Sequence, residues 1–390
     1  MALSLLLLAI VPFLAFQSPG RSGQQVPRGS GGPRPQNDLR LYLSTAAQYG
    51  AGNRAGALRE IRQWWLPEIA RATAALRREQ LHLRSEAKNP DDIDFHTVEG
   101  AVLMHAQAGI MFLQDQKLRA AKIHLDASSE LLQWSRKAAA EARNWTTMRR
   151  ATFKDRPPDP ALELTESINP RDFYVALASA ALSLGYAEAA TPFADQARLE
   201  APLNPVVQLV AGCVASGLAM EKALQHRDAD ASRARRAAEA AFREAVTHDA
   251  AAYEARLRLG KLLLDQNRAV EAEPLLAEVE AKATDERLRY LARLFLGRAA
   301  EQRGRSEDAI RSYRGALETW PSSQAARFGL AHALEKASGP GPARAIVGAL
   351  LDPSRRTDGP SDPWFLYPIG PPGLAQAAFN RVWDRTAVVP

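Results

Sequence analysis

The chain has 390 residues, of which 46% are hydrophobic, 24% are charged and only 7% are aromatic. This length allows two or three domains, and the apolar fraction is large enough for a well-packed core. A single cysteine, Cys213, excludes an intramolecular disulfide and any metal site built from several cysteines.

The net charge is +6, from 50 Lys and Arg against 44 Asp and Glu. The basic residues alternate with acids along the chain and do not form one block. We therefore predict a solvated surface of mixed charge and no nucleic-acid partner, although a basic balance is typical of such partners. Ala, Leu, Arg and Glu dominate while Val, Ile and Thr are sparse, which favours helix over sheet.

The chain begins MALSLLLLAIVPFLAF, an uncharged hydrophobic run that is too short for a stable bilayer span. Residues 1–17 therefore predict a signal peptide and a periplasmic or secreted protein, with no stable membrane span after cleavage. The Lys or Arg that usually precedes such a run is missing, and an uncleaved N-terminal anchor is the alternative. Residues 18–36 are rich in Gly, Pro, Ser and Arg without apolar periodicity, which predicts a disordered linker.

The region from residue 37 to residue 153 shows helical periodicity and only faint internal repeats, such as the one around Gly109. Trp64 and Trp65 begin a helix in this region, and we interpret them as core side chains between terminal helices. Residues 154–170 contain four prolines, which predicts a loop before the next helical region.

The clearest internal repeat is LGRAAEQRGRSEDAIRSYRGALETWP, residues 296–321. Its small residues Gly297 and Ala309 are followed by Tyr313 at helical spacing, and Pro321 ends the second helix. Because Gly297 lies within one helix and Ala309 lies early in the next, we expect the two backbones to cross closely at these small residues.

The same pattern recurs along the chain. It returns 34 residues downstream at Leu330-Ala331 and 37 residues upstream at Leu259-Gly260, with further copies at Leu177-Ala178 and Val210-Ala211. The second half of the copy at Val210 comes 15 residues late, which predicts one lengthened hairpin.

Leu-Gly or Leu-Ala, followed by Ala, an aromatic residue and Pro at these intervals, resembles the tetratricopeptide repeat family, and the leader resembles that of exported bacterial members. The resemblance covers residues 171–351 and is clearest from residue 251 onward. It implies an all-α, right-handed solenoid of antiparallel helix pairs. Residues 37–153 would then be degenerate hairpins of the same type.

The C-terminal extension, residues 352–390, departs from the helical pattern and contains several Pro and Gly residues. Solenoids need their last apolar face covered, so we expect an irregular cap in which Trp364, Phe365 and Tyr367 lie on the final hairpin. A partner-docking motif is the alternative, because these three residue types are common interface anchors.

No catalytic pattern is present: the sequence has no metalloprotease His pair, nucleophile elbow, phosphate-binding loop or Cys-x-x-Cys. We therefore predict no enzyme activity, no catalytic residue, no cofactor and no metal site. The resemblance instead implies a binding groove formed by the first helix of each hairpin. Helical spacing places six polar residues towards that groove: Arg258, Lys261, Arg298, Glu301, His332 and Lys336.

Basic residues in such a groove would suit an acidic peptide held by charge-assisted hydrogen bonds. The alternative is that these cations pair with neighbouring acids. The sequence therefore predicts a non-catalytic scaffold that binds protein or peptide partners in the cell envelope or outside the cell. A carbohydrate- or peptidoglycan-associated accessory module is the second hypothesis, and it requires Trp364, Phe365 and Tyr367 to be exposed together.

Overall fold

The computed structural model describes Gly56 and residues 95–114, 116–152, 168–351, 362–371, 373–375, 377, 378 and 381. The predicted signal peptide, the linker, Trp64 and Trp65 lie outside the described residues, as does most of the Pro-rich stretch. The chain divides into two compact units, residues 1–169 with 385–390, and residues 170–384. Over the described residues the structure is all-helical.

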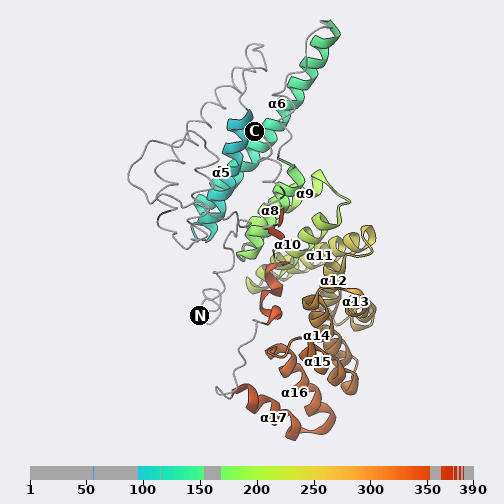
Figure 1. Ribbon diagram of the computed structural model, residues 1–390. Helices are drawn as coiled ribbons and strands as arrows, with labels where there is room; N and C mark the ends of the chain where they lie inside the picture. The colour runs from blue at the N-terminus through green and yellow to red at the C-terminus, as the bar shows by residue number, and fades with distance from the viewer. Residues whose placement is uncertain are drawn as a thin grey trace, which may run out of the picture. The chain divides into compact units, whose positions relative to one another are not determined.

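The first unit contains a hairpin of two long helices, α5 (Phe95–Gln114) and α6 (Leu118–Thr152) (Figure 1). Val102 and Met111 of α5 and Leu125 of α6 are among its buried apolar side chains.

The second unit is a row of five helix hairpins. Its helices are α8 (Pro170–Ser183), α9 (Ala187–Glu200), α10 (Pro205–Leu224), α11 (Asp228–His248), α12 (Tyr253–Asp265), α13 (Ala269–Lys282), α14 (Glu286–Gln302), α15 (Ser306–Thr319), α16 (Gln324–Ser338) and α17 (Pro340–Leu351). The first helices α8, α10, α12, α14 and α16 contact one another in succession. We call their shared free side the inner face, and we call the second helix of each hairpin an outer helix.

Each of the first four hairpins turns through one residue in the left-handed region. The φ angles are +85° at Gly185, +56° at His226, +58° at Asn267 and +70° at Gly304. This conformation lets the last amides of the first helix bond back to its own carbonyls, as Gly185 does to Leu182. The turns are therefore tight, and successive helices run antiparallel.

The hairpin of α10 and α11 is longer than its neighbours, at 20 and 21 residues against 13 to 17 for the helices from α12 to α15. The 15 extra residues of the sequence pattern are therefore helical and extend both helices. By length and composition α10 is apolar enough to cross a membrane, and half of that apolar window is buried inside the protein. Val207, Val210 and Val214 are among the residues that bury this helix between its neighbours.

Candidate functional site

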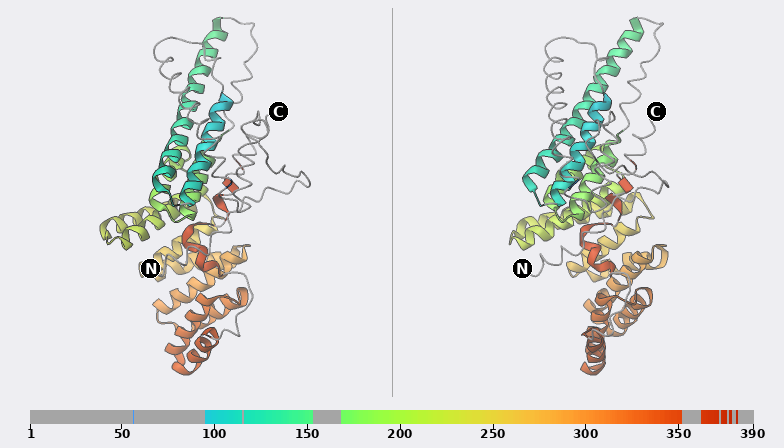
Figure 2. Two further views of the ribbon diagram at one scale, coloured as in Figure 1. Left: turned by 90° about the vertical axis from the view of Figure 1, so that its left-hand side faces the viewer. Right: turned by 60° about the vertical axis from the view of Figure 1, so that its left-hand side comes forward.

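The C-terminal segment, which we define as residues 362–370, lies along the inner face of the second unit. Its 3-10 helix η6 (Pro363–Ile369) contacts α10 and α14. Farther along, Gly370 approaches Leu182 of α8, and Arg381 pairs with Asp172 at the start of α8. The chain therefore crosses the inner face from α16 back to α8, opposite to the order of the repeats. In Figures 1 and 2 this red segment lies beside α10 and α12, away from α17.

This position corrects the expectation that the aromatic residues cap the final hairpin. Trp364 and Tyr367 pack against α12 and α14, where Phe295, Arg258 and Lys261 contact their rings. Tyr367 is buried, Trp364 is half-buried and Phe365 is 45% exposed. The three side chains are therefore not exposed together, and they do not form the shared stacking surface that the carbohydrate hypothesis requires.

Asp362 anchors the start of the segment at the amino end of α16. Its carboxylate accepts hydrogen bonds from the Tyr290 hydroxyl at 2.6 Å, the Ser323 hydroxyl at 3.0 Å and the Ala325 amide at 3.2 Å. A negative charge is favoured here because the free amides at a helix start point towards it. Burial, together with the Asp362 carboxylate, raises the pKa of Tyr290, so this hydroxyl stays a donor.

Arg258 holds the middle of the segment. Its Nη1 donates to the Tyr367 carbonyl oxygen at 3.1 Å, and its guanidinium lies 4.4 Å from the centre of the Tyr367 ring. Its Nε donates to Glu254 at 2.8 Å, and Arg287 donates to the other oxygen of Glu254 at 2.6 Å. Burial acts to raise the pKa of Glu254, but the two guanidinium groups hold it below its ordinary value. Arg258 is therefore a buried cation that joins α12 to the segment.

The aromatic rings form a small cluster. Phe295 of α14 meets Trp364 and Tyr367 edge-on, with ring centres 5.7 Å and 5.4 Å apart. Lys261 lies 5.8 Å from the centre of the Trp364 ring. Each such ring pair or cation–ring contact stabilises by about 0.5–1.5 kcal/mol beyond the buried area. The segment is thus held by side-chain contacts that depend on its own sequence.

The remaining predicted groove residues pair with acids or are exposed. Lys261 and Arg298 both pair with Asp265, the latter at 3.0 Å. Glu301 accepts hydrogen bonds from the Tyr313 hydroxyl at 2.9 Å and pairs with His332 at 2.8 Å. Lys336 is exposed in the last turn of α16. The structure therefore brings Arg258 and Lys261 to the segment, whereas Arg298, Glu301 and His332 pair with residues of the repeat helices.

Sequence reasoning missed Asp362, Tyr290, Ser323 and Phe295. The sequence held one signal for Phe295. It lies 37 residues after Arg258, which is the repeat interval, so the two residues occupy the same position in successive first helices. The pairing of Asp362 with α16 has no comparable local signal.

Cys213 of α10 is 2% exposed, and burial raises the pKa of its thiol to about 11. The neutral thiol is a small core side chain, as the apolar run around it predicts. Among the described ranges no group of three His, Cys, Asp or Glu side chains is placed to hold a metal ion.

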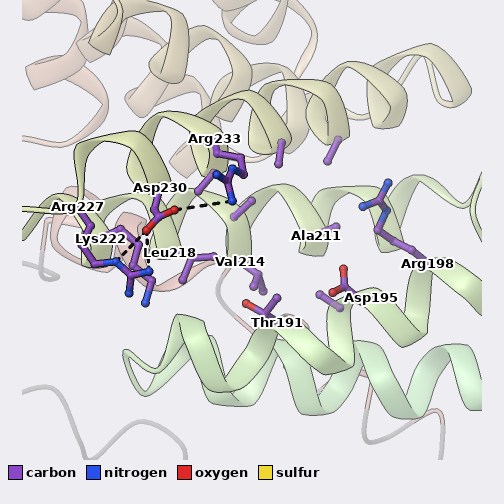
Figure 3. A pocket seen from close by; sticks show the side chains of 15 residues that line it. Thr191, Asp195, Arg198, Ala211, Val214, Leu218, Lys222, Arg227, Asp230 and Arg233 are labelled. Carbon is purple, nitrogen blue, oxygen red and sulfur yellow. Dashed lines mark hydrogen bonds and ion pairs between the residues drawn. The ribbon is translucent and has the colours of Figure 1, made fainter. Parts of the chain in front are cut away.

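A separate hollow of about 310 Å³ lies between α9, α10 and α11 (Figure 3). Alanines line much of it, and Lys222, Arg227, Asp230 and Arg233 gather at one end. Asp230 pairs with Arg227 at 2.6 Å and lies 3.8 Å from Arg233, while Lys222 pairs with Glu188. Asp230 is thus shared between two arginines, and the hollow has a largely apolar lining with charged side chains at its ends.

Glycines set how closely the first helix of a hairpin approaches the second. A Cβ atom added to Gly260 would lie 2.7 Å from Leu276, and one added to Gly297 would lie 2.5 Å from Tyr313, sixteen residues onward in both hairpins. Gly212 meets Phe242 in the same way in the lengthened hairpin. The Tyr313 ring is therefore the side chain packed against Gly297, and Ala309, where the close crossing was expected, is fully buried. The second unit is an all-α solenoid of antiparallel helix pairs, and its hairpins are similar to tetratricopeptide repeats.

Several solved structures are similar to this chain at low sequence identity. A tetratricopeptide repeat protein from Parabacteroides merdae is 14% identical over 73% of this chain and 90% of its own, with a TM-score of 0.42. PilF of Pseudomonas aeruginosa is 19% identical over 56% and 87%, with a TM-score of 0.39. MamA from Desulfovibrio magneticus is 19% identical over 49% and 98%, with a TM-score of 0.38. No protein-family model and no curated protein matches the chain.

The first unit contains a buried histidine pair between α5 and α6. The Nδ1 atoms of His105 and His124 are 3.0 Å apart, and the two residues are 5% and 9% exposed. Burial and the neighbouring His124 lower the pKa of His105 to about 4, and burial also lowers the pKa of His124. Both rings are therefore neutral at pH 7, so that one Nδ1 can donate to the other.

This pair should make the α5–α6 hairpin sensitive to acid. An unfolded histidine takes up a proton near pH 6.5, whereas folded His105 resists it until about pH 4. The contribution of His105 to the free energy of unfolding is therefore fully present above pH 6.5 and is lost as the pH falls. The loss is about 1 kcal/mol at pH 5.5 and about 3 kcal/mol near pH 4. Hydrogen exchange of α5 and α6 should accelerate with acid relative to α12 and α14 in the same sample. His105→Gln should reduce that difference, and an equal response of all four helices would contradict the assignment.

Proposed function

We propose that this chain is an exported, non-catalytic tetratricopeptide scaffold that binds a protein or peptide partner along the inner face of its second unit. The observation that carries the proposal is the C-terminal segment itself. A nine-residue peptide lies on α12, α14 and α16 through a carboxylate, two aromatic rings and a backbone carbonyl. An inner face that holds one peptide by such contacts has the chemistry to recognise another.

The partner's chemistry follows from the same contacts. The amino end of α16 and Tyr290 suit a carboxylate, Phe295 suits aromatic rings, and Arg258 suits a carbonyl or a second carboxylate. A partner segment with an acidic residue followed by spaced aromatic side chains would use all three places. Its affinity should come from the buried rings and the charge-assisted hydrogen bonds at the two ends.

Selection from a displayed peptide library tests this proposal. The full chain and its Asp362→Asn/Tyr367→Ala variant serve as targets, and the selected peptides are then titrated against Lys261→Glu chains. Lys261→Glu should weaken binding at least tenfold, because it reverses the charge beside the aromatic cluster. The matched control is Lys282→Glu on outer helix α13, whose lysine also pairs with an acid four residues away. Equal weakening by both changes, or no selected peptide on either target, would contradict a site on the inner face.

Export is a separate part of the proposal and rests on residues 1–17. Fusing residues 1–36 to alkaline phosphatase, which is active only after export, should give an active enzyme in bacterial cells. Replacing Leu6 and Leu7 with Arg should abolish that activity, because it interrupts the hydrophobic run. Activity that is absent from the unaltered fusion, or that survives the arginines, would contradict export.

A further inference from the structure

The peptide on the inner face belongs to the chain itself. It starts at Asp362, eleven residues after the last residue of α17. It contacts Arg258 and Lys261 of α12 and Phe295 of α14, which belong to the surface proposed for the partner. A partner peptide and the C-terminal segment therefore contact the same side chains, and only one of them can be bound at a time.

We propose that residues 362–370 are an internal ligand of the inner face, displaced by a partner peptide that carries a carboxylate and two aromatic side chains. This inference rests on the proposed function and deepens it, because it gives the site both a partner chemistry and a resting state. The chain then binds its partner only when that partner outcompetes a segment with the same chemistry.

The segment is recognised at separate points, each of which depends on its sequence. Asp362 accepts from Tyr290 of α14, from Ser323 just before α16 and from Ala325 of α16. Tyr367 stacks on Arg258, and its carbonyl accepts from the same guanidinium. Trp364 packs on Phe295. None of these contacts requires a covalent link to α17, so a free peptide of the same sequence would make them equally well.

The segment also leaves the inner face partly unused. Arg258 is only 5% exposed, and its buried Nη2 has no hydrogen-bond partner within the described residues. Asp362 is the only acidic residue of the segment, whose sequence is DPWFLYPIG. A partner that brings a second carboxylate to Arg258 would gain a charge-assisted hydrogen bond that the segment does not make.

One side of the segment remains open to solvent. Phe365 is 45% exposed, and Pro368 is also exposed. These residues contribute little to docking, so Phe365→Ala is a matched control for changes at the buried Tyr367 in the same short segment.

The test titrates a fluorescent peptide of sequence DPWFLYPIG into full-length chains and follows its anisotropy. The unaltered chain should bind it weakly, because its own segment occupies the site. The Asp362→Asn/Tyr367→Ala chain should bind it at least tenfold more tightly, and the Phe365→Ala chain should behave like the unaltered one. A labelled peptide with Tyr replaced by Ala should bind none of the three chains.

The outcomes separate this inference from the proposed function. Equally tight binding to the unaltered and double-variant chains would overturn the internal ligand and leave a peptide site on the inner face. Binding to neither chain, with helical circular dichroism intact in both, would overturn the internal ligand and the peptide site together. If the double variant loses its helical signal, the near-isosteric Asp362→Asn chain replaces it, and a Kd equal to that of the unaltered chain would overturn the inference.

Discussion

Replacing Arg258 with methionine is expected to lower the free energy of unfolding of the second unit by about 3–5 kcal/mol. The guanidinium is 5% exposed, and it pairs with Glu254, whose side chain is only 13% exposed. Methionine fills a similar volume but leaves the Glu254 carboxylate with Arg287 alone, and it removes the donor to the Tyr367 carbonyl. Removing one partner of a buried ion pair costs more than the pair contributes, because the remaining charge is still desolvated.

Urea denaturation followed by circular dichroism measures this effect. Arg298→Met is the matched control, because Arg298 is 40% exposed and pairs with the half-exposed Asp265. That change should cost less than about 1 kcal/mol, as exposed ion pairs generally do. Equal losses for the two variants would show that Arg258 is not the buried anchor of the segment. Arg258→Glu should destabilise the second unit more than Lys261→Glu, because it would place a second acid beside buried Glu254.

Replacing Gly297 with valine is expected to destabilise the second unit by about 3 kcal/mol, at the upper end of overpacking costs. The first added carbon atom would lie 2.5 Å from the Tyr313 ring. Tyr313 is 3% exposed, and a Cβ atom added to Gly329 of the next first helix would also lie 2.5 Å from its ring. It therefore has no free space to move into, and α14 and α15 would have to separate.

The matched control is Gly315→Ala, in the outer helix of the same hairpin. An added Cβ atom there meets its nearest neighbour, a flexible Arg293 carbon, at 3.4 Å. Because alanine favours a helix over glycine by about 1 kcal/mol, the free energy of unfolding of Gly315→Ala should equal or slightly exceed that of the unaltered chain. Thermal unfolding of both variants measures the contrast. A destabilisation by Gly315→Ala as large as that by Gly297→Val would show that helix contact at Gly297 is not the cause.

The repeat pattern predicted the fold well, because its signals are local. Leu-Gly pairs mark the first helices, and a residue sixteen positions later marks the second. Sequence reasoning expected a close crossing of the two helices at Gly297 and Ala309, and the structure adds that the Tyr313 ring is the group packed against Gly297. Tyr313 reaches the glycine because a long helical side chain points back towards the start of its own helix.

The candidate site was only partly predictable. Helical spacing placed Arg258 and Lys261 on the inner helix α12, where they lie, but it gave no sign that Arg258 is buried. One of the groups that cover Arg258 is Tyr367, which lies 109 residues away in sequence. Contacts of this length leave no periodic pattern, so the position of the C-terminal segment had no local signal. The Pro and Gly residues of the extension predicted irregular structure, and they say nothing about which face it covers.

Photo-crosslinking from position 364 tests most directly that the chain occupies its own inner face. Benzoylphenylalanine replaces Trp364 in the full-length chain, and the crosslinked peptides are identified by mass spectrometry after proteolysis. The Trp364 ring lies against Phe295 and near Lys261, so the crosslinks should fall within α12 and α14 of the same chain. Crosslinks confined to α17, or formed only between separate chains, would contradict an inner face filled by residues 362–370.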